Sequence, residues 1–87
     1  MLAANKKQTY QGWSNYETWN IALIINNEYK LYLSACDFMK LYKGATPYKS
    51  WVEHAGLKDK ETIDSVPFTS DKLSYAELNQ MMKGLNS

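Results

Sequence analysis

The side chains that most often carry chemistry are scarce in this sequence of 87 residues. It holds one histidine, His54, and one cysteine, Cys36, and nothing in the sequence indicates that the two meet. Nucleophilic catalysis needs a base within hydrogen-bond reach, and a catalytic carboxylate pair needs separated pKa values. We therefore expect no catalytic residue and a protein that is not an enzyme. His54 is expected at the exposed end of a helix, and Cys36 as a small core residue.

Residues that could bind a metal or a phosphate are equally sparse. One His and one Cys cannot form a structural zinc site, and the acidic segment 59–71 lacks the glycine and terminal glutamate of a calcium-binding loop. The four glycines are isolated, so there is no loop that could cradle a phosphate. We expect no metal and no cofactor, and we interpret 59–71 as a solvated loop.

The charge balance argues against a nucleic-acid partner. Ten lysines face nine acidic residues, which leaves a net charge of +1, and there is no arginine to pair with phosphates or guanine edges. Lys6 and Lys7, with Tyr10 and Trp13 as stacking surfaces, keep nucleic-acid binding as the alternative. Acidic residues among the lysines of the second predicted helix argue against a membrane-surface helix.

Two further features bear on the compartment. A single cysteine cannot form an intramolecular disulfide, which suits a reducing environment. The longest apolar run, Ile21 to Ile25, is far too short to cross a bilayer, and no signal-peptide pattern precedes it. We expect a cytoplasmic protein without a membrane segment.

Aromatic residues are the most unusual feature of the composition. Three Trp and seven Tyr are many for so small a core, and both types dominate protein interfaces. Trp19 and Trp51 are expected in the core. Asn20 lies either on a narrow exposed edge or in the interior with hydrogen-bond partners. The candidate protein-binding residues are Tyr10, Trp13, Asn15, Asn20, Asn27, Tyr29 and Tyr48.

Local signals predict where the elements that hold these residues begin. Ser14 with Glu17 and Ser74 with Glu77 fit capping boxes, and Thr46 before Pro47 fits an N-cap followed by proline at N1. These signals predict helices starting near Asn15, Pro47 and Tyr75. A strand remains the competing interpretation of the apolar run that follows Trp19, although the capping box favours a helix.

The remaining pattern completes an all-α prediction. A second helix is expected from about Glu28 to Lys43 with Gly44 after its end, and Gly56 with Leu57 should stop the third. A long loop, fixed by Ile63, Val66 and Phe68, leads to the last helix, which ends at Gly84. We predict a compact single-domain bundle of about four short helices over residues 13–87, preceded by a flexible arm over residues 1–12.

Residues 12–23 carry a motif of Gly-Trp, then Asn-Tyr-Glu-Thr-Trp, then an aliphatic run. This motif resembles the signature of a family of small uncharacterised proteins of bacteriophages, plasmids and bacteria. The similarity extends to about Glu28, and Ile24 and Ile25 depart from it by being more apolar than the pattern. The resemblance implies an accessory protein of a phage or mobile element that acts on host machinery.

The leading hypothesis is thus a non-enzymatic binding protein that engages a host protein, or itself, through an aromatic surface. The alternative is a nucleic-acid-associated or antirestriction-type accessory protein. Phosphate contacts weaken steeply with added salt, whereas an aromatic protein interface barely responds, so the salt dependence of binding separates the two.

Overall fold

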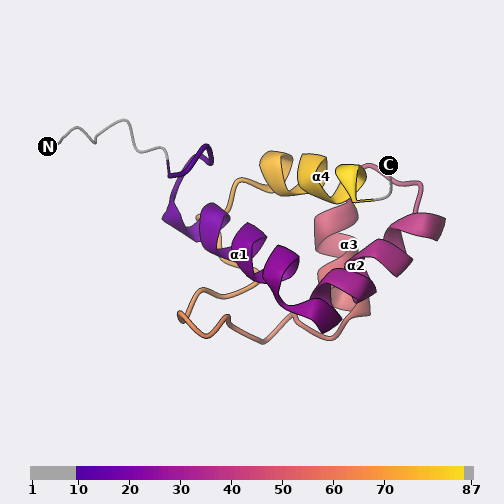
Figure 1. Ribbon diagram of the computed structural model, residues 1–87, viewed down its shortest axis with the longest axis horizontal. Coiled ribbons are helices and arrows are strands. Elements are labelled where there is room, and N and C mark those ends of the chain that lie inside the picture. The colour runs from indigo at the N-terminus through magenta and orange to yellow at the C-terminus, as the bar shows by residue number, and fades with distance from the viewer. Residues whose placement is uncertain (1–9, 86–87) are drawn as a thin grey trace, which may run out of the picture.

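The computed structural model describes residues 10–85, which form four helices and no strand (Figure 1). The helices are α1 (Tyr16–Asn27), α2 (Tyr29–Leu41), α3 (Pro47–His54) and α4 (Tyr75–Gly84). The predicted all-α class and the predicted helix starts are confirmed. The strand interpretation of the apolar run after Trp19 is wrong, because α1 includes the whole run.

The core lies between the four helices: α2 and α4 each pack on the other three, whereas α1 and α3 do not contact each other (Figure 1). The segment 55–74 passes beneath α1 on its way to α4 and contributes three side chains to this core. Burial of these apolar groups is the main favourable term for a domain of this size. The buried apolar residues are Ile21, Ala22, Ile25, Ala35, Met39, Tyr48, Trp51, Val52, Val66, Phe68, Leu73, Leu78 and Met82.

The start of α1 differs from the predicted capping box. Asn15, not Ser14, is the N-cap: its Oδ1 accepts the Thr18 amide at 2.9 Å. Glu17 therefore does not occupy N3, and Ser14 is left free to bond elsewhere. The second predicted box is half confirmed, because Ser74 Oγ accepts the Glu77 amide at 3.3 Å, whereas the Glu77 carboxylate binds Ser14, just before α1, instead of the Ser74 amide.

The junction of α2 and α3 depends on a tyrosine. Thr46 is the N-cap of α3 by position, but its side chain makes no capping bond. The Tyr42 hydroxyl instead accepts the Thr46 amide at 3.3 Å and the Ser50 hydroxyl at 3.2 Å, and these bonds lower the pKa of Tyr42, Ser50 most. Gly44 does not terminate α2, which ends at Leu41; a Cβ at Gly44 would collide with the Tyr42 ring.

The end of α3 follows the prediction. Gly56 has φ +74°, its amide bonds the Glu53 carbonyl at 3.3 Å, and the Leu57 amide bonds the Val52 carbonyl at 2.9 Å. These two bonds are those of a Schellman motif. α4 departs slightly, since Gly84 is its last helical residue rather than its stop signal, and Leu85 is the C-cap.

The burial of three bulky side chains differs from the sequence-based expectation. Val66 and Phe68 fix the long loop as predicted, but Ile63 is 91% exposed and fixes nothing; Leu73 is the third apolar anchor. Trp51 is fully buried, whereas Trp19 is only partly buried, so the prediction of a core Trp19 is wrong. It lies on the α1 face that meets residue 10 instead of the helix bundle.

Tyr48 is the largest fully buried side chain after Trp51, and it carries a polar hydroxyl into the core. It is fully buried, and its hydroxyl donates to the Phe68 carbonyl at 2.7 Å, which connects α3 to the long loop. Burial, with a smaller contribution from Tyr75, raises the pKa of Tyr48 far above the ordinary value of 10. The folded protein therefore holds this proton more tightly than the unfolded chain does.

Because the pKa of Tyr48 is higher in the folded protein than in the unfolded chain, its protonated hydroxyl contributes its full stabilisation below the unfolded pKa of about 10. This stabilisation is lost as the pH rises above that value. We expect Tyr48→Phe to lose about 1 kcal/mol at neutral pH through the missing hydrogen bond. Its stability should then fall less steeply than that of the wild type in the alkaline range. Urea unfolding from about pH 8 to pH 11 measures both effects.

Tyr29→Phe is the matched control, because Tyr29 is 71% exposed and its substitution should change neither quantity. An alkaline slope that is the same in Tyr48→Phe and in the wild type would contradict this account of Tyr48.

Candidate functional site

A tight turn precedes α1 and belongs with the helical domain. The Tyr10 amide bonds the Trp13 carbonyl at 2.7 Å, and the Trp13 amide bonds the Tyr10 carbonyl at 2.8 Å. Gln11 and Gly12, at φ +52° and +92°, supply the left-handed conformations that a type I′ turn needs. Residues 10–12 of the expected arm are thus ordered by the turn, while residues 1–9 lie outside the described residues.

The turn returns Tyr10 to the surface of α1, where three aromatic rings meet. The ring centroids are 4.8 Å apart for Tyr10 and Trp19, 5.4 Å for Tyr10 and Tyr16, and 5.7 Å for Tyr16 and Trp19. Tyr10 is 40% exposed and Tyr16 is 37% exposed. We call these three residues the aromatic cluster; it is a group of mutually packed rings with a face open to solvent.

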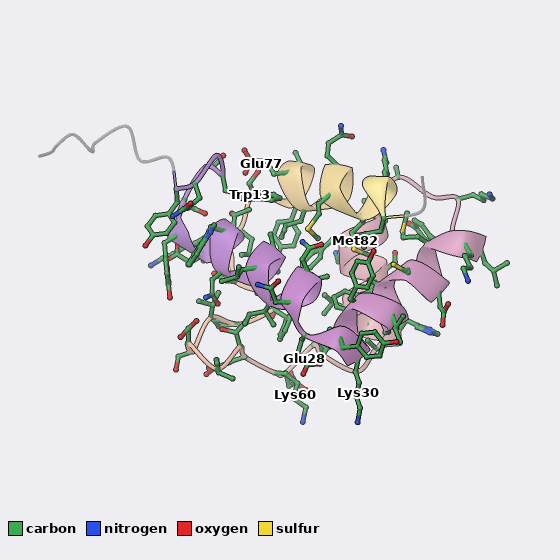
Figure 2. All side chains as sticks on the ribbon, viewed as in Figure 1. Trp13, Glu28, Lys30, Lys60, Glu77 and Met82 are labelled. Atoms are coloured by element: carbon green, nitrogen blue, oxygen red, sulfur yellow. The ribbon has the colours of Figure 1, made fainter. Side chains whose placement is uncertain are left out.

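The base of the cluster is held by bonds between the starts of α1 and α4. Ser14 donates its amide and its hydroxyl to the Glu77 carboxylate, at 3.0 and 2.6 Å. In Figure 2, Glu77 at the start of α4 lies beside Trp13 of the turn. In the opposite direction, the buried Thr18 hydroxyl accepts the Ser74 amide at 2.8 Å.

Asn15 completes this arrangement, since its amide group donates to the Lys72 carbonyl at 2.7 Å while its oxygen caps α1. Each helix start thus provides acceptors for amides of the other. We call this network the paired caps; its members are Ser14, Asn15, Thr18, Lys72, Ser74 and Glu77.

Asn20 connects α1 to the long loop. It is fully buried, its oxygen accepts the Thr62 hydroxyl at 2.7 Å, and its amide group donates to Asp64 Oδ2 at 2.7 Å. The Thr62 hydroxyl in turn accepts the Asp64 and Val66 amides, each at 3.2 Å. The buried alternative for Asn20 is therefore correct, and its side chain does not reach the molecular surface.

The other candidate residues are dispersed. Tyr48 is buried, and Trp13 is partly buried against the core beside the start of α4. Asn27 at the end of α1 and Tyr29 at the start of α2 are both exposed, and Asn27 lies about 16 Å along the helix from Tyr16. The structure therefore unites Tyr10 with Trp13 and Asn15 at one end and leaves Asn27 and Tyr29 at the other.

Two residues of this surface were not among the sequence candidates. Tyr16 is a cluster ring with 37% of its area exposed, and the i, i+3 spacing to Trp19 on one helix face is the signal that could have found it. Asp64, an exposed loop residue, is brought beside α1 by Asn20. No local pattern in the sequence indicates that contact, because 44 residues separate the two.

The groups with catalytic potential lie apart from this surface. His54 packs on Phe38 with ring centroids 5.3 Å apart, and Cys36 Sγ lies 3.8 Å from the Leu85 carbonyl. Within residues 10–85, no group of three or more His, Cys, Asp or Glu side chains is arranged to hold a metal ion. No helix in this range is long and apolar enough to span a membrane.

A hollow of about 530 Å³ lies between α3, the long loop and the start of α4. Its walls are mainly apolar, with Tyr48, Val52 and Phe68 at its base, and Lys49 and Asp71 among its charged lining residues. None of the candidate binding residues except the buried Tyr48 reaches it.

The model of a family of unknown function, DUF7249, matches residues 6–87, nearly the whole chain. The chain belongs to this family. No curated protein and no solved structure matches it.

The paired caps make a specific prediction for Thr18. Thr18→Val keeps the shape but leaves the Ser74 amide without its acceptor, so the free energy of unfolding should fall by about 1 to 3 kcal/mol. Thr18→Ser keeps the hydroxyl and should lose much less. Chemical denaturation of the two variants compares them, and equal losses would show that the hydroxyl bond contributes nothing.

Asn20 makes a second prediction. Asn20→Ala should cost about 1 to 3 kcal/mol, because Thr62 and Asp64 lose their buried partner. Amide hydrogen exchange of residues 61–66 should accelerate in the same variant. Ile63→Ser, a change at a 91% exposed position of the same loop, should stay within about 0.5 kcal/mol of the wild type. Unchanged exchange in Asn20→Ala would contradict the role given to Asn20.

Proposed function

We propose that this protein is a small protein-binding module, an accessory factor of a phage or mobile element, that engages a host protein through the aromatic cluster. One observation carries the proposal: three rings from two separate segments gather at the surface, and both tyrosines keep more than a third of their area exposed. Tyr and Trp are the side chains that most often dominate binding energy at protein interfaces.

The surroundings of the cluster support this role. The turn at residues 10–13, the paired caps and Asn20 restrain the backbone on which the rings stand. A surface whose side chains are ordered before binding loses less conformational entropy when the partner arrives. A pre-ordered aromatic surface therefore binds a protein partner at a lower entropic cost than a loop that must fold on binding.

The charges nearby favour a protein partner over nucleic acid. Aromatic rings can also stack on bases, but such sites depend on cationic groups that follow the phosphates. Among the described residues, two carboxylates lie near the cluster: Glu17 directly follows Tyr16 in the sequence, and Asp64 accepts a hydrogen bond from Asn20. Two negative charges at this position would repel a phosphate backbone.

The test is capture from nuclease-treated host lysate with the tagged full chain. Wild type and Tyr16→Ser are compared, with Tyr29→Ser as the matched control, because Tyr29 is an exposed tyrosine outside the cluster. We expect at least one captured protein to be reduced about tenfold or more by Tyr16→Ser and to be unchanged by Tyr29→Ser.

Circular dichroism should show the same helix content in all three proteins. Sedimentation of the purified chain at several concentrations separates self-association from a host partner. Capture that is reduced equally by both substitutions, or that disappears after nuclease treatment, would contradict the proposal.

A further inference from the structure

The way the rings pack limits what can lie on them. Centroid separations of 4.8 to 5.7 Å mean that the three rings already touch one another. There is no slot between them for an inserted apolar side chain. The rings are tilted by 40 to 78° to one another, so a ligand meets the exposed parts of individual rings instead of one flat surface. Cations and planar π-systems are among the groups that aromatic faces attract.

Two carboxylates decide between these ligands. Asn20 lies four residues after Tyr16, on the same face of α1, and its bond to Asp64 Oδ2 brings that exposed carboxylate beside the ring. Glu17 directly follows Tyr16. Within residues 10–85 the one ion pair joins Asp37 and Lys40. Neither Glu17 nor Asp64 therefore forms an ion pair with a lysine of residues 10–85.

The electrostatic environment of Tyr16 agrees with this placement. Partial desolvation contributes most to raising the pKa of Tyr16, and the charge of Asp64 and, less strongly, of Glu17 raise it further. The positive end of the α1 dipole opposes a bound cation, but it corresponds to only about half a charge against two full negative charges. The net field over the rings therefore favours a cation.

We propose that the cluster of Tyr10, Tyr16 and Trp19, with the adjacent Asp64 carboxylate, binds a cationic side chain of the partner, most favourably arginine. This inference rests on the proposed function and names the chemistry of the partner at that site. Arginine fits best because its planar guanidinium stacks on aromatic faces and still has N–H groups for a carboxylate. Asp64 Oδ1 is available for such a bond, since the Asn20 bond uses Oδ2.

The probe is N-acetyl-arginine amide, titrated into the labelled full chain and followed by the NMR signal of the Trp19 indole N–H. The matched control ligand is N-acetyl-citrulline amide, which has nearly the same shape and no charge. We expect a saturable shift with arginine and an affinity for citrulline that is about two- to fivefold weaker, the size of an exposed cation–π contribution. Equal affinities, or no shift with arginine, would overturn the inference.

Asp64→Asn is the matched protein variant, because the asparagine oxygen can still accept the bond from Asn20 while the charge is gone. It should weaken arginine binding about two- to fivefold and leave citrulline binding unchanged. Tyr16→Leu should weaken both ligands, whereas Tyr16→Phe should retain arginine binding. An Asp64→Asn protein that binds arginine as tightly as the wild type would contradict the part given to the carboxylate.

The two proposals fail in different ways. If Tyr16→Ser abolishes capture of a host protein while arginine and citrulline bind alike, protein binding stands and the cationic ligand is wrong. If arginine binds selectively but no captured protein depends on Tyr16, the cation site stands and the proposed function is wrong.

Discussion

The amide groups at the start of a helix have no partner within that helix, and when two helix starts are packed together water cannot easily supply one. In this protein α1 and α4 meet at their starts, and a side chain in the first turn of each helix accepts the amide of a residue just before the other helix. Thr18 accepts an amide from the α4 side, and the Glu77 carboxylate accepts an amide and a hydroxyl from the α1 side. The segments that begin these helices are about 57 residues apart in sequence, so these bonds fix the bundle as well as the two helices.

The same stretch of chain serves both the fold and the proposed interaction surface. Along residues 14–20, Ser14, Asn15 and Thr18 bond to the α4 side, and Asn20 bonds to the long loop. Tyr16 and Trp19, which lie between them, meet Tyr10 at the surface. Side chains that hold the bundle together thus alternate with side chains that face solvent. This alternation lets one motif stabilise the fold and also present a binding surface. Within residues 10–85, no buried side-chain nitrogen or oxygen lacks a partner, which agrees with so compact a polar arrangement.

Local signals in the sequence were sufficient to predict the presence and approximate starts of the helices, because caps and proline at N1 act over a few residues, but they did not give every helix end. Pro47 and Gly56 behave as such signals indicate. Partners distant in sequence could not be predicted. Ser14 and Glu77 each looked like half of a local capping box, and they bond to each other across 63 residues. The exposure of Ile63 and of part of Trp19 depends on which surfaces the bundle covers, and hydrophobicity alone does not determine that. Of the candidate site, Tyr10 could be named from its type and Tyr16 from its i, i+3 spacing to Trp19, whereas Asp64 is recognised only when the loop is placed against α1.

The mutual support of the two helix starts is tested most directly by a double-mutant cycle between Ser14 and Glu77. The free energy of unfolding in urea is measured for the wild type, Ser14→Ala, Glu77→Gln and the double variant. If the helix starts support each other as described, the two substitutions should be coupled by about 1 to 2 kcal/mol, because either one already removes part of the same charge-assisted bond. Losses that add to within about 0.5 kcal/mol would show that the two helix starts are stabilised independently, and would contradict the central role of the paired caps.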